Sequence, residues 1–221
     1  MEKIRWLLVG GLSATHLIWA VALFADPIWF VRKISQPYAA GVLHLASAAL
    51  IVSRFRVAGL FLSSTVLAFY WAFVKPFEPL AEPQSVGILA ISVSELLRTL
   101  FSENFFTRIL LRGGLAYPFF EWGLDALRNP YHFAAYLSAN KVAAPLFQII
   151  PLYPAIYVLG LYEIVLSLWI VSGLGFRHAC LVTVLTLLIF STVAGYPLAL
   201  PQNIALMAAA AAHLTRSSSS S

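Results

Sequence analysis

Charged residues are scarce in this chain. Only 10% of its 221 residues are Asp, Glu, Lys or Arg, whereas a soluble domain contains about 25%. By contrast, 61% are hydrophobic and the mean hydropathy is +0.85. This composition excludes an ordinary soluble domain and predicts an integral membrane protein. We expect it to be all-α, because a single strand cannot satisfy its backbone hydrogen bonds in lipid.

Cysteine and the common catalytic motifs are also nearly absent. The single cysteine, Cys180, excludes an internal disulfide and a C-x-x-C thiol pair, and we interpret it as a small buried hydrophobe. The sequence contains no H-E-x-x-H, P-loop or serine-nucleophile motif, and we predict no metal site. The net charge of +5 does not indicate nucleic acid, because the basic residues gather at helix ends rather than in a basic stripe.

What the chain does contain is an internal repeat, which decides the architecture. The stretch that begins at Arg5 returns 103 residues later at Arg108, with 9 identities in 26 positions. The hexapeptide PLAEPQ at 79–84 returns as PLALPQ at 197–202. The sequence therefore predicts two copies of one membrane unit.

The predicted modules are residues 1–103 and 104–216, followed by a serine tail at 217–221 that we expect to be disordered. Between the first and second helices of each module the register offset rises from 103 to about 119. The second copy therefore has a longer outer loop at 129–151. Within it, Tyr131–Leu137 is aromatic and amphipathic, so it is predicted to lie flat at the interface or to cap a cleft between the copies.

Eight apolar runs come close to the ~17–25 residues that a membrane-crossing helix needs. They cover 4–25, 38–53, 57–75, 84–101, 107–127, 152–173, 178–195 and 201–215. Each module thus has four spans, and an even number means that both copies insert with the same polarity. We predict two parallel four-helix repeats related by a pseudo-two-fold axis along the membrane normal.

The basic residues predict the orientation. The basic residues on the same side of the membrane as the N-terminus are Lys3, Arg5, Arg54, Arg56, Arg98, Arg108, Arg112, Arg177 and Arg216. Those on the opposite side are Arg32, Lys33, Lys75, Arg128 and Lys141. The excess of nine over five places both termini in the cytoplasm, in a bacterial-type inner membrane.

Ionisable side chains within the spans are functional hypotheses, because each costs at least ~2.5–3.5 kcal/mol on insertion scales. Tyr117, Glu121 and Asp125 lie at i, i+4 and i+8 and so share one helix face. We interpret Asp125 chiefly as a cap for the turn at Asn129. Glu121 is either a hydrogen-bonding partner of a neighbouring helix or a proton-handling group.

Two alignments between the copies pair a glutamate with a histidine: Glu163 with His44, and Glu95 with His213. Facing groups of this kind would form either a proton path or a pair that locks the copies together. We favour the path, because a buried ion pair is weak evidence for stability. A haem held by His16 and His44 would need facing histidines and a cavity, so we interpret His16 as a packing residue and do not predict haem.

The segment GLDALRNP at 123–130 resembles the DoxX family, a group of four-helix membrane proteins that includes the DoxD subunit of thiosulfate:quinone oxidoreductase. The residues that match the family pattern are Arg108, Gly113, Gly114, Gly123, Leu127, Pro130 and Glu163. The segment PQNIAL at 201–206 is similar to the start of the family's last helix.

The resemblance implies a membrane subunit of a quinone-linked redox process. It also implies a protein partner that donates electrons, because the chain has no flavin, iron–sulfur or dithiol motif. Under this hypothesis the proton-handling residues are Glu121 and Glu163, and the residues of an outward-opening substrate cleft are Tyr117, Trp122, Asp125 and His44. The alternatives are a proton-coupled carrier with its site between the copies and a non-catalytic assembly factor. We expect the site in the outer half of the second copy.

Overall fold

The computed structural model describes residues 2–27, 34–73, 82–193 and 199–214, so the serine tail lies outside the described residues. Within them the chain forms nine α-helices and one short 3-10 helix, with no strand. The helices are α1 Glu2–Ala25, α3 Pro37–Val52, α4 Arg56–Phe73, α5 Glu82–Phe101, α6 Phe105–Arg128, α7 Pro130–Ala139, the 3-10 helix Ala144–Gln148, α8 Leu152–Ser172, α9 Phe176–Val193 and α10 Ala199–Leu214. The all-α prediction is confirmed.

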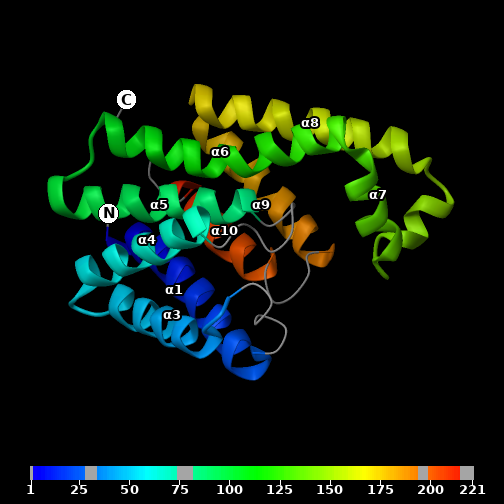
Figure 1. Ribbon diagram of the computed structural model, residues 1–221. Coiled ribbons are helices and arrows are strands. Elements are labelled where there is room, and N and C mark those ends of the chain that lie inside the picture. The colour runs from blue at the N-terminus through cyan, green and yellow to red at the C-terminus, as the bar shows by residue number, and fades with distance from the viewer. Residues whose placement is uncertain (1, 28–33, 74–81, 194–198, 215–221) are drawn as a thin grey trace.

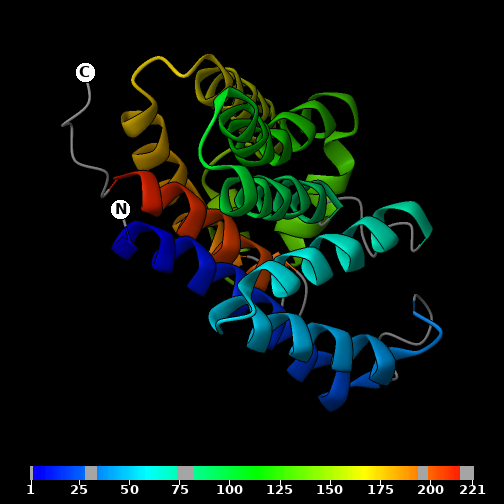
Figure 2. The same ribbon diagram turned by 90° about the vertical axis from the view of Figure 1, so that its left-hand side faces the viewer.

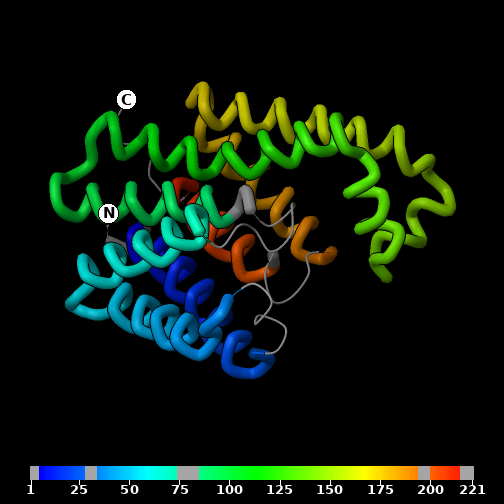
Figure 3. Tube along the Cα trace, viewed as in Figure 1, coloured from blue at the N-terminus to red at the C-terminus, as the bar shows by residue number. Residues whose placement is uncertain are grey.

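The centre of the bundle is formed by α1, α10, α5 and α6 (Figures 1 and 2). On one side α3 packs on α1 and α4, and on the other α8 packs on α6 and α9. Two central contacts cross between the predicted modules: α1 packs on α10, and α6 packs on α5. Figure 3 shows the chain running back and forth along the bundle.

One end of the bundle collects arginines. The Arg56 guanidinium lies 4.5 Å from the ring centre of Trp6, which joins the start of α4 to the start of α1. The Arg112 guanidinium lies 4.9 Å from the ring of Phe176, and Arg5 reaches Glu95 near the end of α5. We call this the arginine-rich end.

Glycines set the spacing of the central helices. A Cβ added at Gly114 on α6 would lie 2.7 Å from the carbonyl oxygen of Gly87 on α5, and one added at Gly11 on α1 would collide with Ala208 on α10. These are close backbone approaches of the kind that small residues permit between membrane helices. Gly11 and Gly114 are each the second glycine of a pair that occurs at aligned positions of the two copies, whereas the first glycines, Gly10 and Gly113, face open space.

Among the described residues, four helices are long and apolar enough to cross a membrane by themselves, rather than the eight predicted. They are Arg5–Ala25, Arg56–Phe73, Leu152–Ser172 and Phe176–Val193. The remaining predicted spans fail this criterion for different physical reasons. Both α3 and α10 have only 16 residues, although α3 is apolar. α6 contains Arg108, Arg112, Glu121 and Asp125, and α5 contains Glu95 and Arg98.

The outer faces of the flanking helices are strongly apolar. Phe61, Val158 and Ile189 are 64%, 70% and 66% exposed, on α4, α8 and α9 respectively. Such exposure of large apolar side chains marks a surface covered by lipid or a partner. Together with the apolar helices it indicates a membrane protein. Inside the bundle Cys180 is fully buried, as its interpretation as a hydrophobe predicted.

The additional residues of the second copy form α7 and the 3-10 helix. α7 packs against α6 and α8, both of the second copy. The Tyr136 hydroxyl and the Asn140 amide both donate to the carbonyl oxygen of Val193, the last residue of α9. The insertion therefore covers the end of α9, and the helices on which α7 mainly packs belong to the second copy.

Candidate functional site

A buried row of hydrogen bonds connects α1, α3, α4 and α5 in the first copy. His16 Nδ1 lies 2.7 Å from His44 Nδ1, and His16 Nε2 lies 2.7 Å from Ser63 Oγ. At one end His44 Nε2 lies 2.9 Å from the Tyr70 hydroxyl. At the other end Ser63 Oγ lies 3.0 Å from Ser92 Oγ. Four of these five side chains, all but Tyr70, are at most 1% exposed.

The row ends at Ser64, whose hydroxyl lies 3.2 Å from Ser92 Oγ. We call the whole set the histidine chain: Tyr70, His44, His16, Ser63, Ser92 and Ser64. Its position follows from helix geometry. At 1.5 Å per residue, Ser63 lies about 10 Å and Tyr70 about 21 Å along α4 from Arg56. The chain thus extends along the middle of the bundle and does not itself reach the arginine-rich end.

Trp19 shields the two histidines. Its ring meets His16 edge-on at 5.7 Å and 85° and lies 5.2 Å from the ring of His44. The second copy repeats this geometry with different chemistry, since Phe119 meets Trp122 at 5.7 Å and 84°. Phe119 is the aligned counterpart of His16, so the second copy keeps the shape of this contact without its hydrogen bonds.

The histidine chain does not offer free ligands to a metal ion. All four ring nitrogens of His16 and His44 are used in hydrogen bonds. No group of three or more His, Cys, Asp or Glu side chains within the described ranges is arranged to hold a metal ion. Tyr117 is 36% exposed and Trp122 is 6% exposed, and their role in a quinone cleft stays a prediction.

Glu163 on α8 is the most isolated polar group. It is 1% exposed, and neither carboxylate oxygen has a hydrogen-bond partner among the described residues. The predicted meeting of Glu163 and His44 does not occur, because His44 bonds His16 and Tyr70 instead. The reason is architectural: α3 and α8 lie on opposite sides of the bundle (Figure 1).

Asp125 has a local role, as its interpretation as a cap predicted. It accepts from the Asn129 side-chain amide at 3.0 Å, and His132 Nδ1 lies 3.0 Å from its second oxygen. These contacts join the end of α6 to the start of α7. Glu121, one turn earlier, is half-buried.

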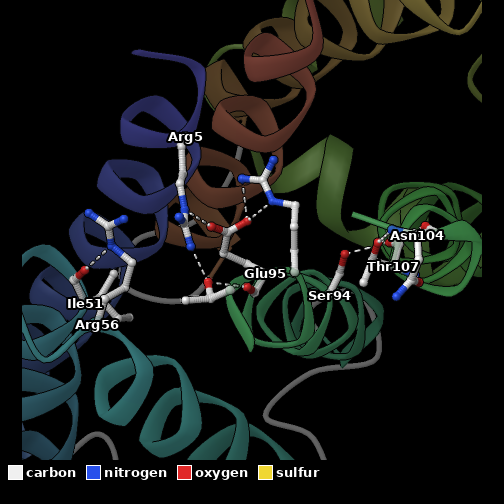
Figure 4. A network of polar contacts seen from close by, with 9 residues as sticks. Arg5, Ile51, Arg56, Ser94, Glu95, Asn104 and Thr107 are labelled. Atoms are coloured by element: carbon white, nitrogen blue, oxygen red, sulfur yellow. Dashed lines mark hydrogen bonds and ion pairs between the residues drawn. The ribbon is translucent and has the colours of Figure 1, made fainter. Parts of the chain in front are cut away.

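A second polar cluster lies at the arginine-rich end (Figure 4). The Glu95 carboxylate, 2% exposed, accepts from Arg5 Nε at 2.8 Å and from Arg98 Nε at 2.8 Å. Arg5 also donates to Thr99. Glu95 and Arg98 thus pair along one face of α5, and Arg5 adds a connection from α1 to α5.

Glu95 and its aligned counterpart His213 line the same small pocket. The pocket is bounded by side chains of all four central helices, among them Leu8, Glu95, Arg98, Arg108 and His213. Of the two predicted Glu/His pairs, this one shares a site and the other does not.

Sequence reasoning missed Tyr70, Ser63, Ser64 and Ser92. A signal did exist: Ser63 and Tyr70 are seven residues apart on one helix, which is two turns, so they share the face that packs inward. His16 was interpreted as a packing residue, but the structure makes it the central link of the histidine chain.

The chain matches no family model, no curated protein and no solved structure. Its resemblance to the DoxX family therefore stays a prediction that rests on the motifs quoted above.

Proposed function

We propose that this protein crosses the membrane eight times, as two parallel four-helix copies related by a pseudo-two-fold axis, with both termini in the cytoplasm. The crossed contacts support this arrangement, because α1 on α10 and α6 on α5 are equivalent under such an axis. The polar helix α6 and the short α10 would then be inner members of the bundle. Charged residues of membrane helices normally face such an interior.

Its function, in this proposal, is proton transfer within the membrane along the histidine chain. The supporting observation is that six polar groups from four helices, all buried except the half-buried Tyr70, form one unbroken row of hydrogen bonds. Protonatable chains of this kind inside a membrane bundle are typical of pumps and transporters.

The hydrogen bonds of the row can point in either direction. A neutral imidazole has one N–H donor and one acceptor nitrogen, and a hydroxyl can donate and accept. If Tyr70 donates to His44, then His44 Nδ1 donates to His16, His16 Nε2 donates to Ser63, and Ser63 donates to Ser92. If Ser92 donates to Ser63 instead, every link reverses and each remains satisfied. A proton accepted at one end and released at the other converts one arrangement into the other.

This property separates a relay from a structural lock. A lock requires only one satisfied arrangement, whereas transfer requires two of similar energy. The histidines are also buried behind Trp19 and inaccessible to solvent. Protons therefore cannot bypass the side chains through water at this point. The proposal includes no step through a quinone, and the quinone-linked hypothesis stays a prediction. The proposal fits a proton-coupled carrier as well as the membrane part of a redox process.

The test is proton flux in liposomes that contain the purified protein and an internal pH-sensitive dye. His16→Phe should reduce the flux to that of protein-free liposomes while leaving the fold intact. Phenylalanine fits, because Phe119 makes the same ring contact in the second copy. The matched control is His178→Phe, at an exposed histidine of α9, which should conduct like the wild type. An unchanged flux in His16→Phe would rule out the histidine chain as the path.

A further inference from the structure

The histidine chain stops one helical turn short of the polar cluster at the arginine-rich end. Ser92 and Glu95 are three residues apart on α5, which corresponds to about 4.5 Å along the helix axis. Ser92 faces α4, through Ser63, whereas Glu95 faces α1, through Arg5. Helices α1 and α5 thus contribute to both the histidine chain and the Glu95 cluster.

The pocket beside Glu95 opens at this end of the bundle and lies between the copies. It is lined by a carboxylate and an imidazole, Glu95 and His213, two side-chain types that proton relays in membrane proteins use. Arg5 and Arg98 hold the carboxylate in place from two sides. A buried charge normally requires such pairing, and here the pairing still leaves Glu95 in the wall of an open pocket.

Between the two levels lies a layer of apolar side chains. Leu8 and Leu12 of α1 are 4% and 0% exposed, and Leu60 of α4 is 0% exposed. Leu12 is one turn from His16, and Leu8 also lines the pocket. The carbonyl oxygen of Leu60 accepts from Ser92 at 3.5 Å, which places this residue directly beside the end of the histidine chain. Apolar constrictions of this kind block conduction by excluding water.

We propose that the Glu95–His213 pocket is the port through which the histidine chain exchanges protons with water at the arginine-rich end. The layer formed by Leu8, Leu12 and Leu60 is the gate between port and chain. This inference rests on the proposed function and adds to it an entry site and a closed state. The bound species at the port is a proton delivered by water, so conduction requires water to enter the leucine layer.

The experiment compares two substitutions that each create a cavity, at aligned positions of the two copies. Leu12→Ala removes part of the gate. Leu115→Ala makes the same change at the aligned position of the second copy, where Phe119 stands in place of His16 and Leu115 is 1% exposed. Both variants are reconstituted in liposomes, and their thermal unfolding is measured to show that both are folded. Leu12→Ala should raise the rate of proton equilibration several-fold, and Leu115→Ala should leave it at the wild-type rate.

A third variant tests the path of the leak. Adding His16→Phe to Leu12→Ala should return the rate to that of protein-free liposomes. Equal rates in the two leucine variants, or a leak that survives His16→Phe, would overturn the gate. If His16→Phe alone fails to lower the wild-type flux, the proposed function fails instead, so the two failures are distinguishable.

The port residue is tested in the leaky Leu12→Ala background. Glu95→Gln should lower the rate, because the amide cannot take up a proton from water. Glu163→Gln is the control, since it makes the same change at a buried acid of α8 that belongs neither to the port nor to the histidine chain. A rate unaffected by Glu95→Gln would remove Glu95 from the port.

Discussion

Removing a single hydroxyl, that of Ser63, should interrupt the histidine chain between His16 and Ser92. Ser63 Oγ is 2.7 Å from His16 Nε2 and 3.0 Å from Ser92 Oγ. In Ser63→Ala the nitrogen of His16 loses its partner in a position that is 0% exposed. A buried polar atom left unsatisfied costs about 1–3 kcal/mol. Ser92 keeps Ser64 and the carbonyl of Leu60 within reach, so we expect the stability loss to come from His16 alone.

The matched control is Ser47→Ala on α3. Ser47 is also 0% exposed, but its hydroxyl donates to the carbonyl of Leu43 one turn earlier on the same helix, at 2.8 Å. That carbonyl keeps its backbone partner when the hydroxyl is removed, so the expected cost is well below that of Ser63→Ala. Stability is read from chemical unfolding in detergent, and transfer from proton flux in liposomes.

Ser63→Ala should lose both stability and flux, whereas Ser47→Ala should keep both. The separation of the two readouts is informative. A Ser63→Ala protein that is destabilised but conducts like Ser47→Ala would show that the hydrogen bonds are structural only. A protein with neither effect would contradict the geometry of the chain itself.

Two further predictions concern packing and the second copy. Gly114→Ala should destabilise the protein, because the added Cβ would lie 2.7 Å from the Gly87 carbonyl oxygen. The control, Gly113→Ala, should be neutral, because a Cβ there meets nothing within 4 Å. Equal unfolding midpoints for the two variants would contradict the close contact of α5 and α6. Glu163→Gln should be at least as stable as the wild type and should conduct normally, because the amide replaces a buried acid that has no partner among the described residues. A loss of more than about 1 kcal/mol would mean that the carboxylate is charged and paired.

The helices were predictable because their signals are local. The apolar runs at 107–127 and 152–173 correspond to α6, Phe105–Arg128, and α8, Leu152–Ser172. Ends fall where charges, glycines and prolines interrupt the run, and these are visible in the sequence. Whether a helix can cross lipid by itself was harder to predict, because inside a bundle the neighbouring helices tolerate charges that lipid would not.

The site was not predictable, because its members meet only after four helices pack. Nothing in the sequence near His16 indicates that His44 and Ser63 will be its partners. The alignment of the copies instead paired His44 with Glu163. In the proposed two-fold arrangement, aligned residues meet only if they lie close to the axis. Glu95 and His213 line one pocket, on the central helices α5 and α10, which pack together.

The two copies share one ring contact but differ in the polar side chains around it. Trp19 and Trp122 occupy aligned positions and make the same edge contact. In the first copy that contact is to His16, which continues through His44 into a row of hydrogen bonds. In the second it is to Phe119, and the aligned acid Glu163 has no partner within the described residues. Because the shape is retained while the donors and acceptors are not, proton transfer along such a row is expected only in the first copy. Phe119 of the second copy already makes this ring contact. Replacing His16 with phenylalanine therefore removes the hydrogen bonds of the imidazole with little change in packing.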